Sequence, residues 1–87
     1  MGHMDTPATQ AFRNAHLNLF ELAMECIRNG DFEGAFTASE AMETLSREAP
    51  EDVDQVEKYK AHFVGMGINL TVTALLEREN RLKSERD

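Results

Sequence analysis

The chain has 87 residues, with 16 Asp or Glu against 9 Lys or Arg, so its net charge is −7. A chain of this length forms one domain, which buries only about 60–65% of the surface that its unfolded state exposes. An acidic body repels phosphates, so we expect no binding to nucleic acid and none to an anionic membrane. The one cysteine, Cys26, allows no disulfide within the chain and no paired-cysteine zinc site. An unpaired thiol suits a reducing compartment, and we expect a cytoplasmic protein.

The first four residues, MGHM, are typical of an expression-tag remnant, and no apolar run of a signal peptide follows them. We therefore expect residues 1–7 to comprise this remnant and a disordered N-terminus. Residues 8–87 are expected to form a single helical domain, with helices at about 8–29, 31–48 and 51–85.

The first helix is predicted to follow Thr6, which could cap it, and Pro7, which suits a first turn. Asn29-Gly30 is typical of a helix stop, and Asp31 can cap a second helix that ends before Pro50. Because almost no loop separates the two helices, we expect them to fold back on each other as an antiparallel hairpin.

The turn of this hairpin reads NGDFEGAF, with Gly30 and Asp31 followed by the aromatic Phe32 and the small Ala35. It resembles the turn between the two helices of a tetratricopeptide repeat. No second copy of the pattern exists in the chain, so the resemblance implies a helical hairpin and no solenoid.

The third helix is predicted to begin with Glu51, Asp52 and Asp54 in its first turn, where acidic side chains complement the positive helix end. It contains a long uncharged stretch, AHFVGMGINLTVTALL, over residues 61–76. This stretch is too short and too polar for a membrane span, which needs about 20 apolar residues. Residues 68–74 alternate as a strand does, but no second strand is predicted to pair with them, and helix-forming residues flank the stretch. We predict a helix.

Two apolar stripes run along this third helix. One follows coiled-coil spacing through Val53, Val56, Lys60, Phe63, Gly67, Leu70 and Ala74. The second consists of Val64, Ile68, Val72 and Leu75, and we expect it to contact a second subunit or a partner protein. Gly65 and Gly67 belong to the same predicted interface: they either allow close approach of another helix or mark a kink, and the sequence leaves both open.

His62 is the one residue that suggests a different class of function. His62, Phe63 and Val64 begin the stretch HFVGM, which is similar to the phosphoacceptor segment of histidine phosphotransfer domains. Gly65 and Met66 stand where that family has a lysine and a glycine. The resemblance implies phosphotransfer through His62 as the alternative function.

No other pattern points to chemistry, because the carboxylate pairs lie on solvated helix faces without a histidine close by. We therefore expect no enzyme activity, no cofactor and no metal. The predicted fold is all-α: an antiparallel helical hairpin packed on a long third helix, a three-helix bundle that dimerises through that helix.

The size, acidity and helix order of the chain resemble those of the short chaperones of flagellar and other type III secretion systems. That resemblance implies a non-enzymatic protein–protein interaction module, acting as a secretion chaperone or as an adaptor that binds a regulator. The expected partners are a second copy of the chain, in a homodimer, and a basic or helical protein, since an acidic surface steers basic partners.

Overall fold

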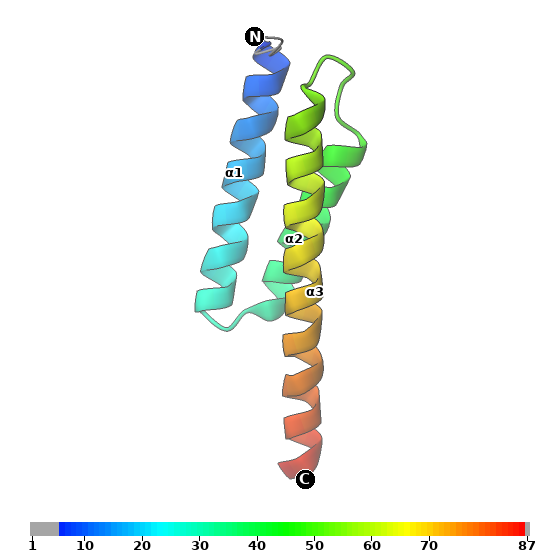
Figure 1. Ribbon diagram of the computed structural model, residues 1–87. Coiled ribbons are helices and arrows are strands. Elements are labelled where there is room, and N and C mark those ends of the chain that lie inside the picture. The colour runs from blue at the N-terminus through cyan, green and yellow to red at the C-terminus, as the bar shows by residue number, and fades with distance from the viewer. Residues whose placement is uncertain (1–5, 87) are drawn as a thin grey trace.

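The computed structural model describes residues 6–86 and consists of three helices, α1 (Pro7–Arg28), α2 (Phe32–Arg47) and α3 (Gln55–Arg86). α1 and α2 form an antiparallel hairpin, and α3 runs along it (Figure 1). The predicted all-α fold, a hairpin packed on a long third helix, is confirmed. Residues 68–74 are helical, and no strand occurs in the part of the chain that the structure describes. The expected tag remnant lies outside the described residues.

Both helices of the hairpin begin at capping side chains. The Thr6 hydroxyl accepts the Thr9 N–H at 3.0 Å, and Pro7 is the first residue of α1. Residues 6 and 7, which we expected to belong to the disordered terminus, therefore start the helix. The Asp31 carboxylate caps α2 by accepting the Gly34 N–H at 3.0 Å.

The turn between α1 and α2 depends on one left-handed residue. Gly30 has a φ of +76°, a conformation that costs glycine little because it has no Cβ. Its N–H donates to the Ile27 carbonyl at 3.1 Å, and the Asp31 N–H donates to the Cys26 carbonyl at 2.8 Å. These bonds satisfy carbonyls at the end of α1 and reverse the chain within three residues.

α3 begins at Gln55, four residues later than predicted. Glu51 and Asp52 lie in a turn that is closed by a 3.2 Å bond from the Val53 N–H to the Pro50 carbonyl. This turn brings the Val53 side chain, 4% exposed, into a small core cluster with Phe12 and Ala61. Burial of Val53 thus takes precedence over the helix-start signal of the acidic residues.

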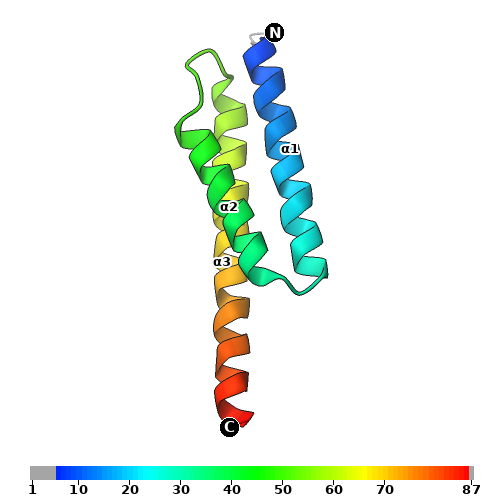
Figure 2. The same cartoon turned by 180° about the vertical axis from the view of Figure 1, so that it is seen from behind.

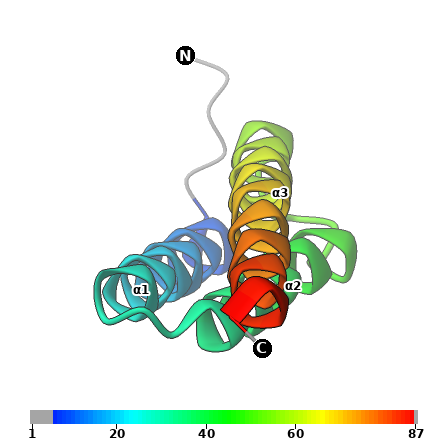
Figure 3. The same cartoon turned by 90° about the horizontal axis from the view of Figure 1, so that it is seen from below.

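α2 lies between the other two helices, and the core forms where it packs against them (Figures 2 and 3). It packs along α1 and α3, whereas α1 and α3 make few contacts with each other. Alanines make up half of the main core cluster, so the backbones approach closely; its buried members are Ala23, Ala35, Ala38, Met42, Ile68 and Val72. Seen from below, α1 and α2 lie along one side of α3, and no other helix of residues 6–86 covers the opposite side (Figure 3).

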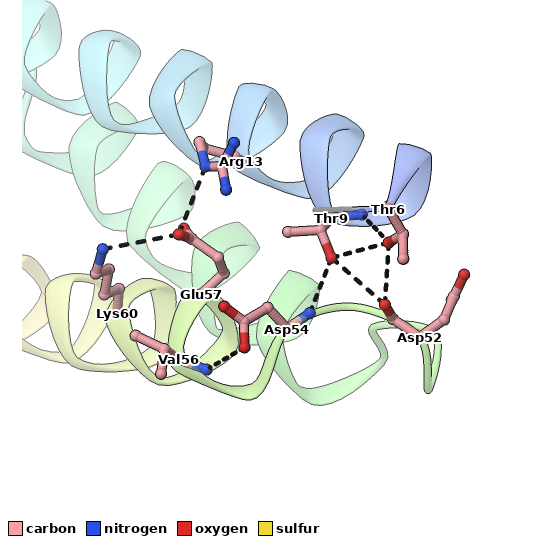
Figure 4. A network of polar contacts seen from close by, with 8 residues as sticks. All are labelled: Thr6, Thr9, Arg13, Asp52, Asp54, Val56, Glu57 and Lys60. Atoms are coloured by element: carbon pink, nitrogen blue, oxygen red, sulfur yellow. Dashed lines mark hydrogen bonds and ion pairs between the residues drawn. The ribbon is translucent and has the colours of Figure 1, made fainter. Parts of the chain in front are cut away.

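α1 meets the start of α3 at a polar clamp (Figure 4). The buried Thr9 hydroxyl accepts the Asp54 N–H at 3.0 Å and lies 3.4 Å from the Asp52 carbonyl. One turn along, Arg13 Nε lies 3.5 Å from a carboxylate oxygen of Glu57, which is itself buried. Beyond this clamp α1 and α3 diverge (Figures 1 and 3).

α3 is continuous through Gly65 and Gly67, which settles whether the glycines break it. Its 32 residues span about 48 Å, twice the length of the 16-residue α2 at ~1.5 Å per residue. Its C-terminal third therefore extends past the hairpin, as Figures 1 and 2 show, and residues 77–85 are all exposed.

Candidate interaction surface

The stripe that we expected to face a partner lies against α2 instead. Val72 is fully buried and Ile68 is 8% exposed. Gly65 is also buried, and a Cβ at this position would lie 3.0 Å from both the Met42 Cβ and the Ser39 carbonyl oxygen. Val64 and Leu75 are half-buried at the edges of the same face. Gly65, Ile68 and Val72 of this stripe, the inner stripe below, are therefore core of the chain itself, which contradicts their assignment to a partner.

Gly67 is the exception among the predicted interface residues. It is exposed, and nothing lies within 4 Å of the place where a Cβ would be. The lack of a side chain at Gly67 is therefore not required for close packing within the chain.

The opposite face of α3 carries a second row of apolar side chains, which we call the outer stripe. Its members are spaced in alternating steps of three and four; they are Val56, Tyr59, Phe63, Met66 and Leu70. Their exposed fractions are 54%, 55%, 63%, 39% and 68%. Helices that are apolar on both faces are covered on both, so this face has the character of an unfilled helix–helix contact.

The C-terminal part of the outer stripe, from Phe63 to Leu70, lies in the uncharged stretch of residues 61–76, although the net charge of the chain is −7. Lys58 and Lys60 flank Tyr59 at the N-terminal part, and no acidic residue occurs between Lys58 and Leu76. Two rings of the outer stripe already touch, since the centroids of Tyr59 and Phe63 are 6.4 Å apart. Large, rigid aromatic side chains with little charge around them are typical of the centre of protein interfaces.

A smaller apolar surface lies on α1. Leu17 and Phe20, 49% and 37% exposed, share a stripe with Arg13, the residue that reaches α3. They therefore line the side of α1 that faces the widening gap to α3. Exposed carboxylates of Glu21 and Glu25 border this surface.

His62 is half-buried in a shallow depression of about 310 Å³. Two cations, Arg47 and Lys58, line the same depression. The imidazole meets the Phe63 ring edge-on, with centroids 5.4 Å apart. The structure thus provides a cationic neighbourhood for His62 from the end of α2 and from the preceding turn of α3.

The other histidine in the described helices, His16, belongs to the core. Its residue is 9% exposed, and this burial lowers its pKa. The nearby Glu57 carboxylate opposes the lowering, and Lys60 adds to it. The ring is therefore held in its neutral form over more of the pH range than a free histidine.

Cys26 shows no sign of activation. Burial raises the pKa of its thiol, and the Asp31 carboxylate raises it further. A thiol that resists deprotonation is a poor nucleophile at neutral pH, so Cys26 acts as a small packing residue beside the core.

Residues 6–86 contain no group of three His, Cys, Asp or Glu side chains placed to hold a metal ion. No helix within this range is long and apolar enough to cross a membrane. Of the surfaces described, the outer stripe is the most extended apolar one.

No protein-family model, no curated protein and no solved structure matches the chain. The resemblances to a tetratricopeptide turn, to secretion chaperones and to phosphotransfer domains therefore stay predictions.

Proposed function

We propose that this chain is a non-enzymatic protein-interaction module that acts by packing the outer stripe of α3 against another helix. The observation that carries the proposal is the set of five exposed apolar side chains in coiled-coil spacing, from Val56 to Leu70. Surface apolar residues are usually scattered, whereas this row is continuous over four helical turns.

We further propose that the chain is a chaperone-like or regulator-binding adaptor with a basic partner. Eleven acidic residues against two cations between Glu21 and Glu57 support a basic partner, because such an imbalance speeds encounter with positive surfaces. The apolar side of α1 with Leu17 and Phe20, bordered by Glu21 and Glu25, is a second area that such a partner would contact.

The test replaces Leu70 with Asp. Leu70 is 68% exposed, so the substitution leaves the fold intact but places a charge in the docking face. We expect complexes of the wild-type protein with itself or with a partner in the native cell extract, followed by light scattering and affinity capture, to be lost in Leu70→Asp. Circular dichroism should show the same helix content for both proteins.

Asn18→Asp is the matched control, since Asn18 is exposed on α1 and the change adds the same single charge without altering side-chain size. It should retain every complex. If Leu70→Asp also retains all of them, α3 is not the binding surface and the proposal is wrong.

A second candidate function is phosphotransfer through His62, and the depression shared with Arg47 and Lys58 favours it. The phosphoryl group would move from a small donor to an imidazole nitrogen, with an N–P bond formed as the donor's bond to phosphorus breaks. Two cations next to the ring would balance the added negative charge.

Intact-mass measurement after incubation with acetyl phosphate tests this candidate. A mass gain of one phosphoryl group that disappears in His62→Gln would support it. An unmodified wild-type protein would end it.

A further inference from the structure

The outer stripe has a shape and a charge pattern that fit one particular occupant. We infer that it is covered by the outer stripe of a second copy of this chain, with the two α3 helices antiparallel. The inference deepens the proposed function and rests on it, because it names the helix that packs on the face.

The spacing of the outer stripe sets the register. Antiparallel coiled-coil packing places each residue of one heptad core position opposite the other core position of the partner helix. Setting Phe63 opposite Met66 of the second copy also sets Tyr59 opposite Leu70 and Val56 opposite Thr73. Each large ring then meets a flexible or branched aliphatic side chain, and the two-fold symmetry of the pair repeats every such contact.

Charge decides between the two possible directions. The loop before α3 is strongly acidic, with Glu48, Glu51, Asp52 and Asp54 within seven residues. A parallel pair would bring two of these loops together, so that like charges repel. In the antiparallel register Ala74 lies opposite Gln55, so Arg78 and Arg81 of one copy extend past the start of α3 of the other copy, at the end where its acidic loop lies.

The C-terminal extension of α3 thereby gains a role. Residues 77–85 are exposed and carry three cations, Arg78, Arg81 and Lys83, against three acids. In the antiparallel pair, this extension runs beside the acidic loop of the second copy. Its cations thus come near opposite charge, while the two acidic loops are kept apart.

The area available is sufficient for a dimer at the small end of the usual range. Tyr59 and Phe63, each more than half exposed, contribute roughly 250 Å² between them. With Val56, Met66 and Leu70 the stripe falls in the range of about 300–600 Å² that is typical of the largest apolar patch on a monomer. Two copies, with flanking polar atoms, then approach the ~1,200 Å² of small specific interfaces.

Cysteine cross-linking in the full chain tests both the partner and the direction. Tyr59→Cys and Leu70→Cys are made separately in a Cys26→Ser background, with a size tag on one variant, and are oxidised mildly alone and mixed. The antiparallel register predicts a disulfide only in the mixture, between position 59 of one variant and position 70 of the other. Within one variant the two thiols lie eleven residues apart along the axes, about 16 Å, which no disulfide spans.

The outcomes separate this inference from the proposed function. A dimer by light scattering with cross-links only in the mixture is the expected result. Cross-links within each variant alone would show a parallel pair, and a dimer without either cross-link would place the contact elsewhere. Each of these, like a strictly monomeric protein at high concentration, overturns the inference. A partner that is captured by wild type but not by Leu70→Asp would still uphold the proposed function.

Discussion

Both faces of α3 are apolar, but one is buried against the hairpin and the other is exposed. The inner face presents small or β-branched residues, among them Ala61, Gly65, Ile68 and Val72, and all four are buried. The outer stripe presents larger side chains, with Tyr59 and Phe63 among them, and is more than half exposed at four of its five positions. The difference shows that size complementarity, and not hydrophobicity alone, selected the face that packs on the hairpin.

α2 explains this selection. Its buried face is built from Ala35, Ala38 and Ser39 with Met42, so a close helix–helix approach requires an equally flat opposing surface. The approach also brings polar groups into reach: Asn69 Nδ2 donates to the Ser39 hydroxyl at 3.3 Å, and the Ser46 hydroxyl donates to the Lys58 carbonyl at 2.8 Å. These bonds add specificity to a contact that the aromatic face could not make.

Placing the same charge on each face of α3 tests the difference between them with the largest expected effect. Val72→Asp buries a carboxylate without a partner, which should cost about 3–5 kcal/mol and unfold most of this small domain. Leu70→Asp, two residues away on the outer stripe, should cost less than about 1 kcal/mol at low protein concentration, through helix propensity alone. Urea unfolding followed by circular dichroism measures both.

Low concentration matters in this experiment because a dimer would add stability by mass action, and Leu70→Asp would remove that contribution. If Leu70→Asp proves the more damaging variant in the dilute monomer, the assignment of the two faces is contradicted.

Adding one methyl group at each of the two glycines of α3 tests how closely each face packs. Gly65→Ala drives a Cβ to 3.0 Å from a Met42 side-chain carbon and a backbone oxygen of Ser39, so we expect a loss of about 1–3 kcal/mol. Gly67→Ala meets open space within a helix and should stabilise the protein by about 0.5–1 kcal/mol. Thermal melts of the two variants should therefore shift in opposite directions, and a shift in the same direction would refute the close approach at Gly65.

The hairpin was predictable from sequence because its signals are local. Thr6, Pro7, Gly30 and Asp31 act within one helical turn of their own position, through capping bonds or a backbone conformation. The start of α3 was not predictable in this way, because the acidic residues before it also match the local pattern of a first helical turn. Val53 lies outside the helix because its side chain packs with the distant Phe12 and Ala61.

The choice of face on α3 also depends on distant residues. Both stripes repeat with the helical period, so periodicity could not rank them. One available signal was residue size: small residues at Ala61 and Gly65 match the small residues at Ala35 and Ala38, which points to the closely packed pair. The cationic surroundings of His62 were hidden for the same reason, since Arg47 comes from another helix.

A smaller effect is expected at the polar clamp that closes the inner face at its N-terminal end. Thr9→Val keeps the buried volume but removes the hydroxyl that accepts the Asp54 N–H and lies beside the Asp52 carbonyl. The Thr6 hydroxyl still donates to the Asp52 carbonyl at 3.1 Å, but the Asp54 N–H loses its acceptor, which should cost about 1–2 kcal/mol in the free energy of unfolding. Thr37→Val, at an exposed position on α2, removes a comparable hydroxyl and should stay within about 0.5 kcal/mol of wild type. Equal losses in the two variants would mean that the clamp contributes nothing of its own.

The smallest expected effect is a dependence of stability on pH that arises on the buried side of α1. Burial lowers the pKa of His16 in the folded chain, so the unfolded chain, with a pKa near 6.5, binds the proton first as pH falls. The His16 contribution is therefore complete above about pH 6.5 and is lost as pH falls from there through the lowered folded pKa. Urea midpoints between about pH 8 and pH 5 should decline more steeply for wild type than for His16→Gln. Glu57→Gln removes the carboxylate that partly offsets the burial, so the decline should become steeper still; a shallower one would show that Glu57 does not act on His16 as its position implies.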